Sequence, residues 1–184
     1  MGFKIFNNKL IKYTEEPGIT NITIPYGVTN IGYGAFWGCT SLTSITIPDS
    51  VTSTGNWAFR DCTSLTGVTI PDSITELGNC AFYGCTSLTS VIIPDSVTLV
   101  GSWVFYGCTS LKNVTINSDN INNIKELNIP SFVIIKCNPD SITDKAAKAA
   151  GYATEPIMTP LQKALLDAQD IIKNNTNNNL SIER

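Results

Sequence analysis

A 23-residue period runs through the middle of the chain and constrains its fold more than any other feature. Proline recurs at this spacing, at Pro25, Pro48, Pro71 and Pro94, and so does cysteine, at Cys39, Cys62, Cys85 and Cys108. The near-identical copies begin at Ile22, Ile45, Val68 and Val91, and a fifth copy begins at Val114 and then breaks down. A unit this short cannot bury a core of its own, so the copies must stack into a solenoid.

Each unit contains one strand that alternates between buried and exposed side chains. In the strand that opens the third copy, the alternation predicts that Leu65, Val68 and Ile70 face inward and that Gly67 and Thr69 face outward. The proline that follows ends the strand because it has no N–H to donate to a sheet.

The rest of each unit is predicted to be a turn and a short helical segment. The recurring glycines are expected to adopt positive φ at Gly32, Gly55, Gly78 and Gly101. The Ala-Phe pair and the cysteine that follow predict one helical turn, which in the second copy points Ala58, Phe59 and Cys62 into the core.

The repeat resembles the BspA-like, or Treponema-type, leucine-rich repeat. In the second copy the pattern is carried by Leu42, Ile45, Ile47, Pro48, Val51, Gly55, Ala58, Phe59 and Cys62. The resemblance covers residues 19–116 and implies a right-handed horseshoe, with a parallel sheet on its concave face and short helical turns on its convex side. It also implies a protein that binds other proteins, often on the surface of bacteria or protists. The copies depart from the pattern locally at Thr54, at Val104 and at the pair Arg60-Asp61.

The flanks predict a cap at each end of the stack. Residues 1–18 are predicted to form a hairpin around Asn7-Asn8. The repeats occupy 19–116, and 117–156 is expected to be a C-terminal cap with strands at Leu127–Pro130 and Phe132–Lys136. The cap is predicted to end in a short helix, with a capping box at Ser141–Asp144 and Gly151 as its stop.

Residues 157–184 are predicted to form a separate amphipathic helix and tail. The helix begins at Thr159-Pro160 and carries an apolar stripe at Leu161, Ala164, Leu165, Ala168, Ile171 and Ile172. The asparagine-rich run Asn174–Asn179 is predicted to be disordered. The favoured interpretation docks this helix on the cap, and the alternatives are that it pairs two chains or links to a further domain.

The residue inventory excludes several classes of function. The chain of 184 residues has no histidine, which removes the common histidine-dependent catalytic and zinc sites, so neither an enzyme nor a cofactor is expected. A net charge of −3 without a basic cluster argues against nucleic acid as a partner. No apolar run is long enough to span a bilayer. Met1 to Lys12 contains no apolar signal core, so a cytoplasmic location stays open beside the cell-surface or secreted location that the resemblance implies.

Two recurring rows of polar residues invite a metal assignment. The four repeat cysteines are expected to form a buried column of reduced thiols, because residues stacked at the strand spacing of about 4.8 Å cannot surround one zinc. Cys80 is predicted to lie outward and Cys137 in a cap strand, each without a partner. The second row is Asp49, Asp72 and Asp95. Each is expected to cap its own turn, with a Ca²⁺ site as the less favoured alternative.

The aromatic residues beside the buried Ala-Phe pair are the strongest candidates for a binding site. They occupy two positions three residues apart, and the proposed binding residues are Trp37, Trp57, Arg60, Tyr83, Trp103 and Tyr106. Tryptophan, tyrosine and arginine are the residue types enriched at binding hot spots. The alternatives are that the rings only cover the convex side, or that they stack on sugars.

The sequence therefore predicts a non-enzymatic protein-binding or adhesion module that recognises a host or cell-surface protein, with a glycan as a second kind of ligand. The alternative function is a structural module that assembles by pairing its C-terminal helix.

Overall fold

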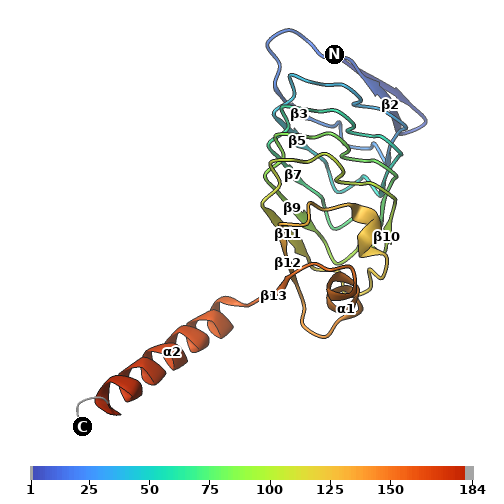
Figure 1. Ribbon diagram of the computed structural model, residues 1–184. Coiled ribbons are helices and arrows are strands. Elements are labelled where there is room, and N and C mark those ends of the chain that lie inside the picture. The colour runs from blue at the N-terminus through green and yellow to red at the C-terminus, as the bar shows by residue number, and fades with distance from the viewer. Residues whose placement is uncertain (1, 181–184) are drawn as a thin grey trace.

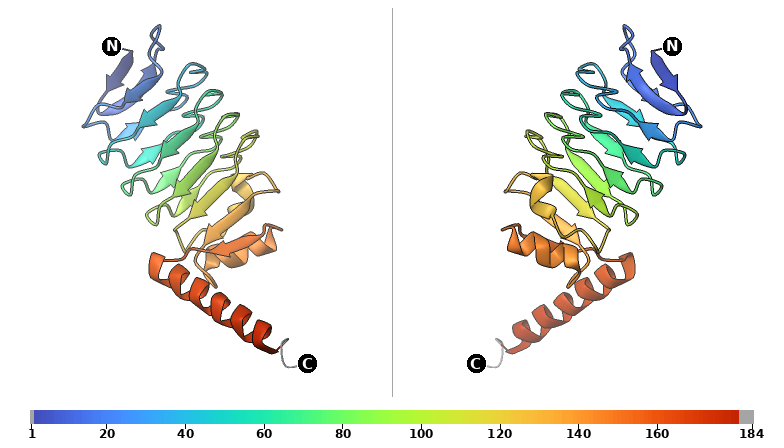
Figure 2. Two further views of the ribbon diagram at one scale, coloured as in Figure 1. Left: turned by 90° about the vertical axis from the view of Figure 1, so that its left-hand side faces the viewer. Right: turned by 90° about the vertical axis from the view of Figure 1, so that its right-hand side faces the viewer.

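The chain folds as a stack of coils, capped by a hairpin at one end and by helices at the other (Figures 1 and 2). The structure is a computed structural model that describes residues 2–180, with the backbone alone described at 170 and at 172–180. The predicted solenoid is confirmed, and most buried apolar residues form one continuous core along the stack.

A seven-stranded parallel sheet, here called the long sheet, forms one side of the stack. Its strands are β3 (Asn21–Thr23), β5 (Ser44–Thr46), β7 (Gly67–Thr69), β9 (Ser90–Ile93), β11 (Asn113–Ile116), β12 (Ile134–Cys137) and β13 (Thr154–Pro156). Equivalent residues of successive copies lie side by side, as Val68 does beside Val91. The predicted alternation is confirmed, since Leu65, Val68 and Ile70 are buried and Thr69 is exposed.

A second, six-stranded sheet is present that the repeat pattern does not predict. It contains the hairpin β1 (Phe3–Phe6) and β2 (Lys9–Tyr13), followed by β4 (Asn30–Ile31), β6 (Ser53–Thr54), β8 (Glu76–Leu77) and β10 (Leu99–Val100). The hairpin turns at Asn7 and Asn8, both with positive φ, and strand β2 then pairs with β4 in parallel. This places the hairpin as a cap on the first coil.

The turn segments close the third side of each coil, and they are hydrogen-bonded turns rather than helices. Within the second copy the N–H groups of Trp57, Phe59 and Asp61 donate to carbonyls of the next coil, at 2.8, 2.8 and 2.7 Å. Trp57 and Asp61 are left-handed, with φ of 62° and 58°. The expected helical turn cannot continue through these residues, because a residue in the left-handed conformation interrupts a right-handed helix.

The explanation predicted for the recurring glycines is wrong. Gly32, Gly55, Gly78 and Gly101 are absent from the positive-φ residues, which include Gly34 and Gly84 instead. A Cβ at Gly78 would lie 2.5 Å from the carbonyl carbon of Gly55, and the other three glycines meet backbone at 2.4–2.8 Å. Glycine is needed here because successive coils touch backbone to backbone.

The core between the three sides is a column of aromatic rings. Phe36, Phe59, Phe82 and Phe105 are fully buried, with adjacent ring centroids 5.0, 5.0 and 5.7 Å apart and interplanar angles of 5–10°. Each ring therefore fills the space between two neighbouring coils, which couples the stability of every coil to the next.

The C-terminal cap differs from its prediction at one strand. Residues Ile124–Leu127 form a 3₁₀ helix, η1, and the predicted strand at Leu127–Pro130 is absent. The carbonyls of Glu126 and Leu127 instead accept the N–H groups of Trp103 and Phe105, so this segment continues the ladder of turn segments. The predicted short helix is present as α1 (Ile142–Ala149), where the Ser141 hydroxyl accepts the N–H of Asp144 at 3.0 Å.

The last helix, α2 (Pro160–Leu180), projects away from the stack rather than docking on it (Figures 1 and 2). Its predicted start is confirmed by reciprocal bonds between Thr159 and Gln162, at 2.8 and 3.2 Å. All side chains from 160 to 169 are exposed, so the favoured docking interpretation is wrong. The helix also continues through Asn174–Asn179, where the composition predicts disorder. No glycine or proline interrupts the helix there, and each asparagine lowers helix stability by at most about 0.7 kcal/mol relative to alanine. None of the described helices is long and apolar enough to cross a membrane.

Candidate functional site

The turn segments present a continuous group of aromatic side chains along one side of the stack. This aromatic cluster comprises Tyr33, Trp37, Trp57, Arg60, Tyr83, Trp103 and Tyr106. The structure brings together all six binding residues predicted from the sequence and adds Tyr33. The repeat pattern hides Tyr33, because the equivalent position is Asn56, Asn79 or Ser102 in the later copies.

The N-terminal half of the cluster is organised around Arg60. Its guanidinium carbon lies 5.3 Å from the ring centroid of Trp37, 4.9 Å from that of Trp57 and 4.8 Å from that of Tyr83. Its Nε donates to the Asp61 carboxylate at 3.2 Å, and the same oxygen accepts the Trp37 indole N–H at 3.3 Å. These interactions hold the Arg60 guanidinium among the three rings that surround it.

The rings on either side complete the contact network. Trp37 meets Trp57 edge to face at 5.4 Å, and Tyr33 lies 5.2 Å from Trp57. In the C-terminal half, Tyr83 stacks on Tyr106 at 5.1 Å, and Tyr106 lies 6.0 Å from Trp103. These separations fall in the range of favourable aromatic pairs, so the cluster is held in shape before any partner binds.

Two tryptophans of the cluster occupy a backbone conformation that disfavours large side chains. Trp57 and Trp103 both have φ of 62°, whereas the first copy has Gly34 at the equivalent position, with φ of 54°. The left-handed conformation costs a residue with a Cβ about 1–2 kcal/mol. The backbone conformation therefore does not account for a tryptophan at this position, because glycine would adopt the same conformation at a lower cost in free energy.

The cluster is most exposed toward its two ends. Trp37, Trp103 and Tyr106 expose 45%, 55% and 50% of their surface, while Trp57, Arg60 and Tyr83 are half-buried between them. A pre-formed apolar surface with tryptophan and tyrosine at its exposed points is suited to bury against another protein.

The structure shows where the aspartate row and the cysteine row lie, the two rows that invited a metal assignment. The carboxylates of Asp49, Asp72 and Asp95 are exposed, and the proline turns are closed by backbone bonds such as Val51 N–H to the Pro48 carbonyl at 3.0 Å. The predicted caps by these aspartates are therefore wrong. Among the described residues, no three acidic, cysteine or histidine side chains gather as a metal site would.

The repeat cysteines form the predicted buried column, and all six cysteines are free thiols. The thiols of Cys62, Cys85 and Cys108 each donate to the phenylalanine carbonyl of the preceding copy, at 3.1–3.2 Å. Burial raises the pKa of Cys85 well above its usual value and raises the pKa of Cys108 to about 12. Thiols held protonated in this way are structural hydrogen-bond donors rather than nucleophiles. Cys80 is half-exposed, and Cys137 lies in strand β12 as predicted. The expectation that Cys137 has no partner is wrong, because its thiol donates to the Asp144 carboxylate at 3.8 Å.

Comparison with known proteins identifies the repeat. The family model described as BspA type leucine-rich repeat region, in six copies, matches residues 10–134. No curated protein matches the chain.

Three solved structures illustrate the fold. A leucine-rich cell surface protein from Faecalibacterium prausnitzii is 30% identical, with a TM-score of 0.59 over 88% of this chain and 39% of that chain. The pneumococcal vaccine antigen PcpA is 20% identical, with a TM-score of 0.69 over 83% of this chain and 45% of that chain. The Treponema pallidum leucine-rich repeat protein is 20% identical, with a TM-score of 0.52 over 83% of this chain and 94% of that chain. This chain thus spans less than half the length of the first two proteins.

Proposed function

The chain belongs to the BspA-type leucine-rich repeat family, and from that premise we propose that it is a non-enzymatic protein-binding module whose partner docks on the aromatic cluster. Leucine-rich repeats are generally scaffolds that bind proteins along an extended surface. The observation that carries the proposal is the placement of Trp57 and Trp103 at left-handed positions. The first copy of the repeat has glycine at this position, so folding of the coil does not require the tryptophan rings, and we infer that they contact a partner.

A protein partner suits this surface better than a glycan. A sugar stacks on an open ring face, but Tyr83 has Arg60 4.8 Å away and Tyr106 stacked on it at 5.1 Å. At Tyr83 a partner can therefore contact the edge of the ring rather than its face. The indole of Trp103 is exposed beside it. Edges, hydroxyls and an exposed indole are the groups that a protein partner buries at the centre of an interface.

We further propose that the module acts at a cell surface and recognises a host or cell-surface protein. The support is similarity, since the solved F. prausnitzii relative is a cell surface protein at 30% identity. Adhesion follows as the role of such a module when its partner is held on another surface.

The test uses two substitutions in the full chain that each introduce the residue carried by another copy of the repeat. Trp103→Gly removes an exposed ring and places glycine where the first copy has Gly34. The control, Tyr26→Asp, removes an 88% exposed ring outside the cluster and introduces the residue found at Asp49, Asp72 and Asp95. Both proteins should keep their far-ultraviolet circular dichroism.

Binding is then measured against a panel of immobilised extracellular-matrix proteins, with and without enzymatic deglycosylation of the panel. For a matrix protein that the wild type binds, Trp103→Gly should weaken affinity at least about tenfold, while Tyr26→Asp should leave it unchanged. Equal binding by all three proteins would remove the aromatic cluster from consideration. Loss of binding on deglycosylation would replace the protein partner with a glycan.

A further inference from the structure

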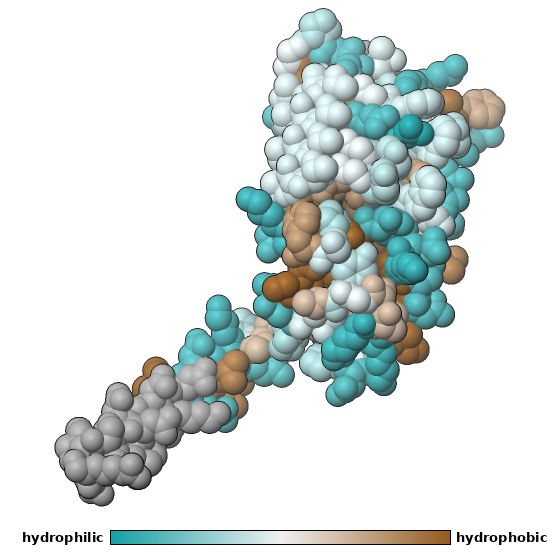
Figure 3. Space-filling model, viewed as in Figure 1, coloured by the Kyte–Doolittle hydropathy of each residue, from teal (hydrophilic) through white to brown (hydrophobic). Residues whose placement is uncertain are grey.

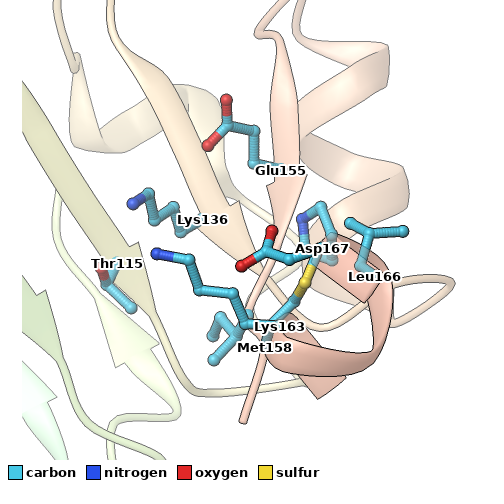
Figure 4. Close-up of a pocket in the computed structure, with 9 residues that line it drawn as sticks. Thr115, Lys136, Glu155, Met158, Lys163, Leu166 and Asp167 are labelled. Atoms are coloured by element: carbon cyan, nitrogen blue, oxygen red, sulfur yellow. The ribbon is translucent and has the colours of Figure 1, made fainter. Parts of the chain in front are cut away.

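Helix α2 turns one side toward the solenoid and the opposite side toward solvent. Lys163, Leu166 and Asp167 line a hollow that Lys136 of β12 and Glu155 of β13 close from the other side (Figure 4). The residues of α2 that line this hollow identify the side of the helix that faces its own solenoid.

Four residues of the apolar stripe lie on the other side of the helix. At 100° per residue, Leu161, Ala164, Ala168 and Ile171 lie about 140–160° around the axis from Leu166. Leu161 is 81% exposed and Ile171 is 62% exposed. Figure 3 shows apolar side chains at the surface of the described part of α2. These four stripe residues therefore lie on the side of the helix opposite the hollow, whereas Leu165 lies at the edge of the stripe and lines a second hollow with Pro139 and Ile157.

A helix in this position needs a partner to remain folded. Helices in proteins are stabilised mainly by packing an apolar face, and asparagine is a weak helix former. The side chains from 160 to 169 are all exposed, and the second half of the helix is rich in asparagine.

We propose that α2 pairs with α2 of a second copy of this chain, parallel and in register, with the apolar stripe as the interface. This inference goes beyond the proposed binding function and does not depend on it. Two identical helices carry the same stripe, so it is self-complementary about a twofold axis. Small residues at Ala164 and Ala168 allow the two helix backbones to approach closely.

Charge favours a second copy over a membrane or a strongly charged partner. Between residues 160 and 169 the helix carries one cation, Lys163, and one anion, Asp167. A helix that lies on a membrane surface carries a basic polar face and aromatic anchors, and this segment has neither. Two neutral copies meet without repulsion.

The position of the stripe sets the direction of pairing. Its residues lie between Leu161 and Ile172, and the asparagine run follows at 174–179. Only a parallel, in-register pair places apolar residues against apolar residues and asparagines against asparagines along the full helix. Since Leu161, Ala164, Ala168 and Ile171 lie on the side of α2 opposite the hollow, pairing through them puts the two solenoids on opposite outer sides of the helix pair.

The mass of the full chain in solution, measured by multi-angle light scattering over a range of micromolar concentrations, tests the pairing. The wild type should have the mass of a dimer. Ile171→Asp, in the stripe, should reduce the mass to that of a monomer. Leu166→Asp makes the same apolar-to-aspartate change on the opposite side of the helix and should remain a dimer. A monomeric wild type, or a dimer insensitive to Ile171→Asp, would overturn the proposal.

Oxidative cross-linking tests the direction of pairing independently of helix stability. In a Cys80→Ser background the remaining five cysteines are buried, so an added cysteine is the reactive one. Leu161→Cys, at the end of the stripe, should form disulfide-linked dimers rapidly on mild oxidation, because an antiparallel pair would separate the two copies of this residue by about 16 Å along the axis. Lys163→Cys, on the side facing the solenoid, should not cross-link. Equal rates for the two variants, or no cross-linking of Leu161→Cys, would contradict a parallel pair.

Discussion

The guanidinium carbon of Arg60 lies 4.8 Å from the ring centroid of Tyr83, a residue of the next coil. Arg60 occupies the position that Trp37, Tyr83 and Tyr106 fill in the other copies, so a cation replaces one ring in a column of rings. Arg60 departs from the repeat pattern in the sequence, and in the structure it joins the two halves of the aromatic cluster.

Replacing Arg60 should therefore loosen the cluster. Arg60→Gln removes the cation from the three rings that surround it, and we expect a loss of about 1 kcal/mol of unfolding free energy. The near-ultraviolet circular dichroism of the tryptophans should weaken at the same time. Arg60→Lys, which keeps a cation, should show a smaller change in both signals. An unaltered tryptophan signal in Arg60→Gln would mean that the rings hold their arrangement without Arg60.

The close contact between coils predicts that alanine is destabilising at Gly78 but tolerated at Gly67. Gly78→Ala would place its Cβ 2.5 Å from backbone of the preceding coil, whereas Gly67→Ala meets nothing within 4 Å. We expect Gly78→Ala to lower the unfolding free energy by about 1–3 kcal/mol, as overpacking does, and Gly67→Ala to leave it nearly unchanged. Chemical denaturation of both variants measures the difference. Similar stabilities would contradict the backbone contact.

The solenoid and its register follow from the sequence because period and alternation are repeated in every copy. A side chain such as Val68 or Phe59 is constrained by its equivalents in the neighbouring copies, so its burial is predictable from the alignment of the repeats alone. The caps are not repeated, and the sequence around Leu127 on its own predicts a strand. Its actual conformation is set by the backbone donors Trp103 and Phe105 of the coil above.

Other features depend on contacts that no local pattern records. The two-residue strands of the second sheet are too short to show alternation. The spacing of the aromatic residues predicts that they share one side, and the structure confirms this, but the enclosure of Arg60 by rings of three coils depends on side-chain packing. The apolar stripe of α2 is likewise visible in the sequence, whereas the direction in which the helix leaves the cap is not part of that pattern.

Thr54 offers a stabilising substitution. It is buried at a position where the other copies have Ile31, Leu77 and Val100, and its hydroxyl accepts the Gly78 N–H at 3.2 Å. In Thr54→Ile this N–H can take the residue 54 carbonyl, as Gly55 does with Ile31 at 2.7 Å. Added apolar burial should then raise the unfolding free energy by about 1 kcal/mol and increase the melting temperature. A lower melting temperature would show that the hydroxyl contributes more than the added apolar surface.

Acid should weaken the C-terminal cap through Asp144. The Asp144 carboxylate accepts hydrogen bonds from Lys148 at 2.7 Å, from Thr154 at 2.8 Å and from the Asp140 N–H at 3.1 Å. These interactions, the bond from Lys148 foremost, lower the pKa of Asp144 to about 2.

Because the folded-state pKa lies below that of an unfolded aspartate, about 3.9, the stabilisation is complete above about pH 5 and is lost as the pH falls through about 2. Thermal unfolding across this interval should show a melting temperature that declines with acid. The decline should be shallower in Asp144→Asn, which starts from a lower value at neutral pH. Parallel curves for the two proteins would remove Asp144 as the source.

The three tryptophans of the chain all lie in the aromatic cluster, which makes one measurement decisive for the binding claim. In protein labelled with 5-fluorotryptophan, ¹⁹F nuclear magnetic resonance reports on Trp37, Trp57 and Trp103 and on nothing else. On titration with a matrix protein that binds the chain, the exposed Trp37 and Trp103 resonances should shift or broaden, with a smaller change at the half-buried Trp57. Three unchanged resonances at saturation would contradict docking on this surface.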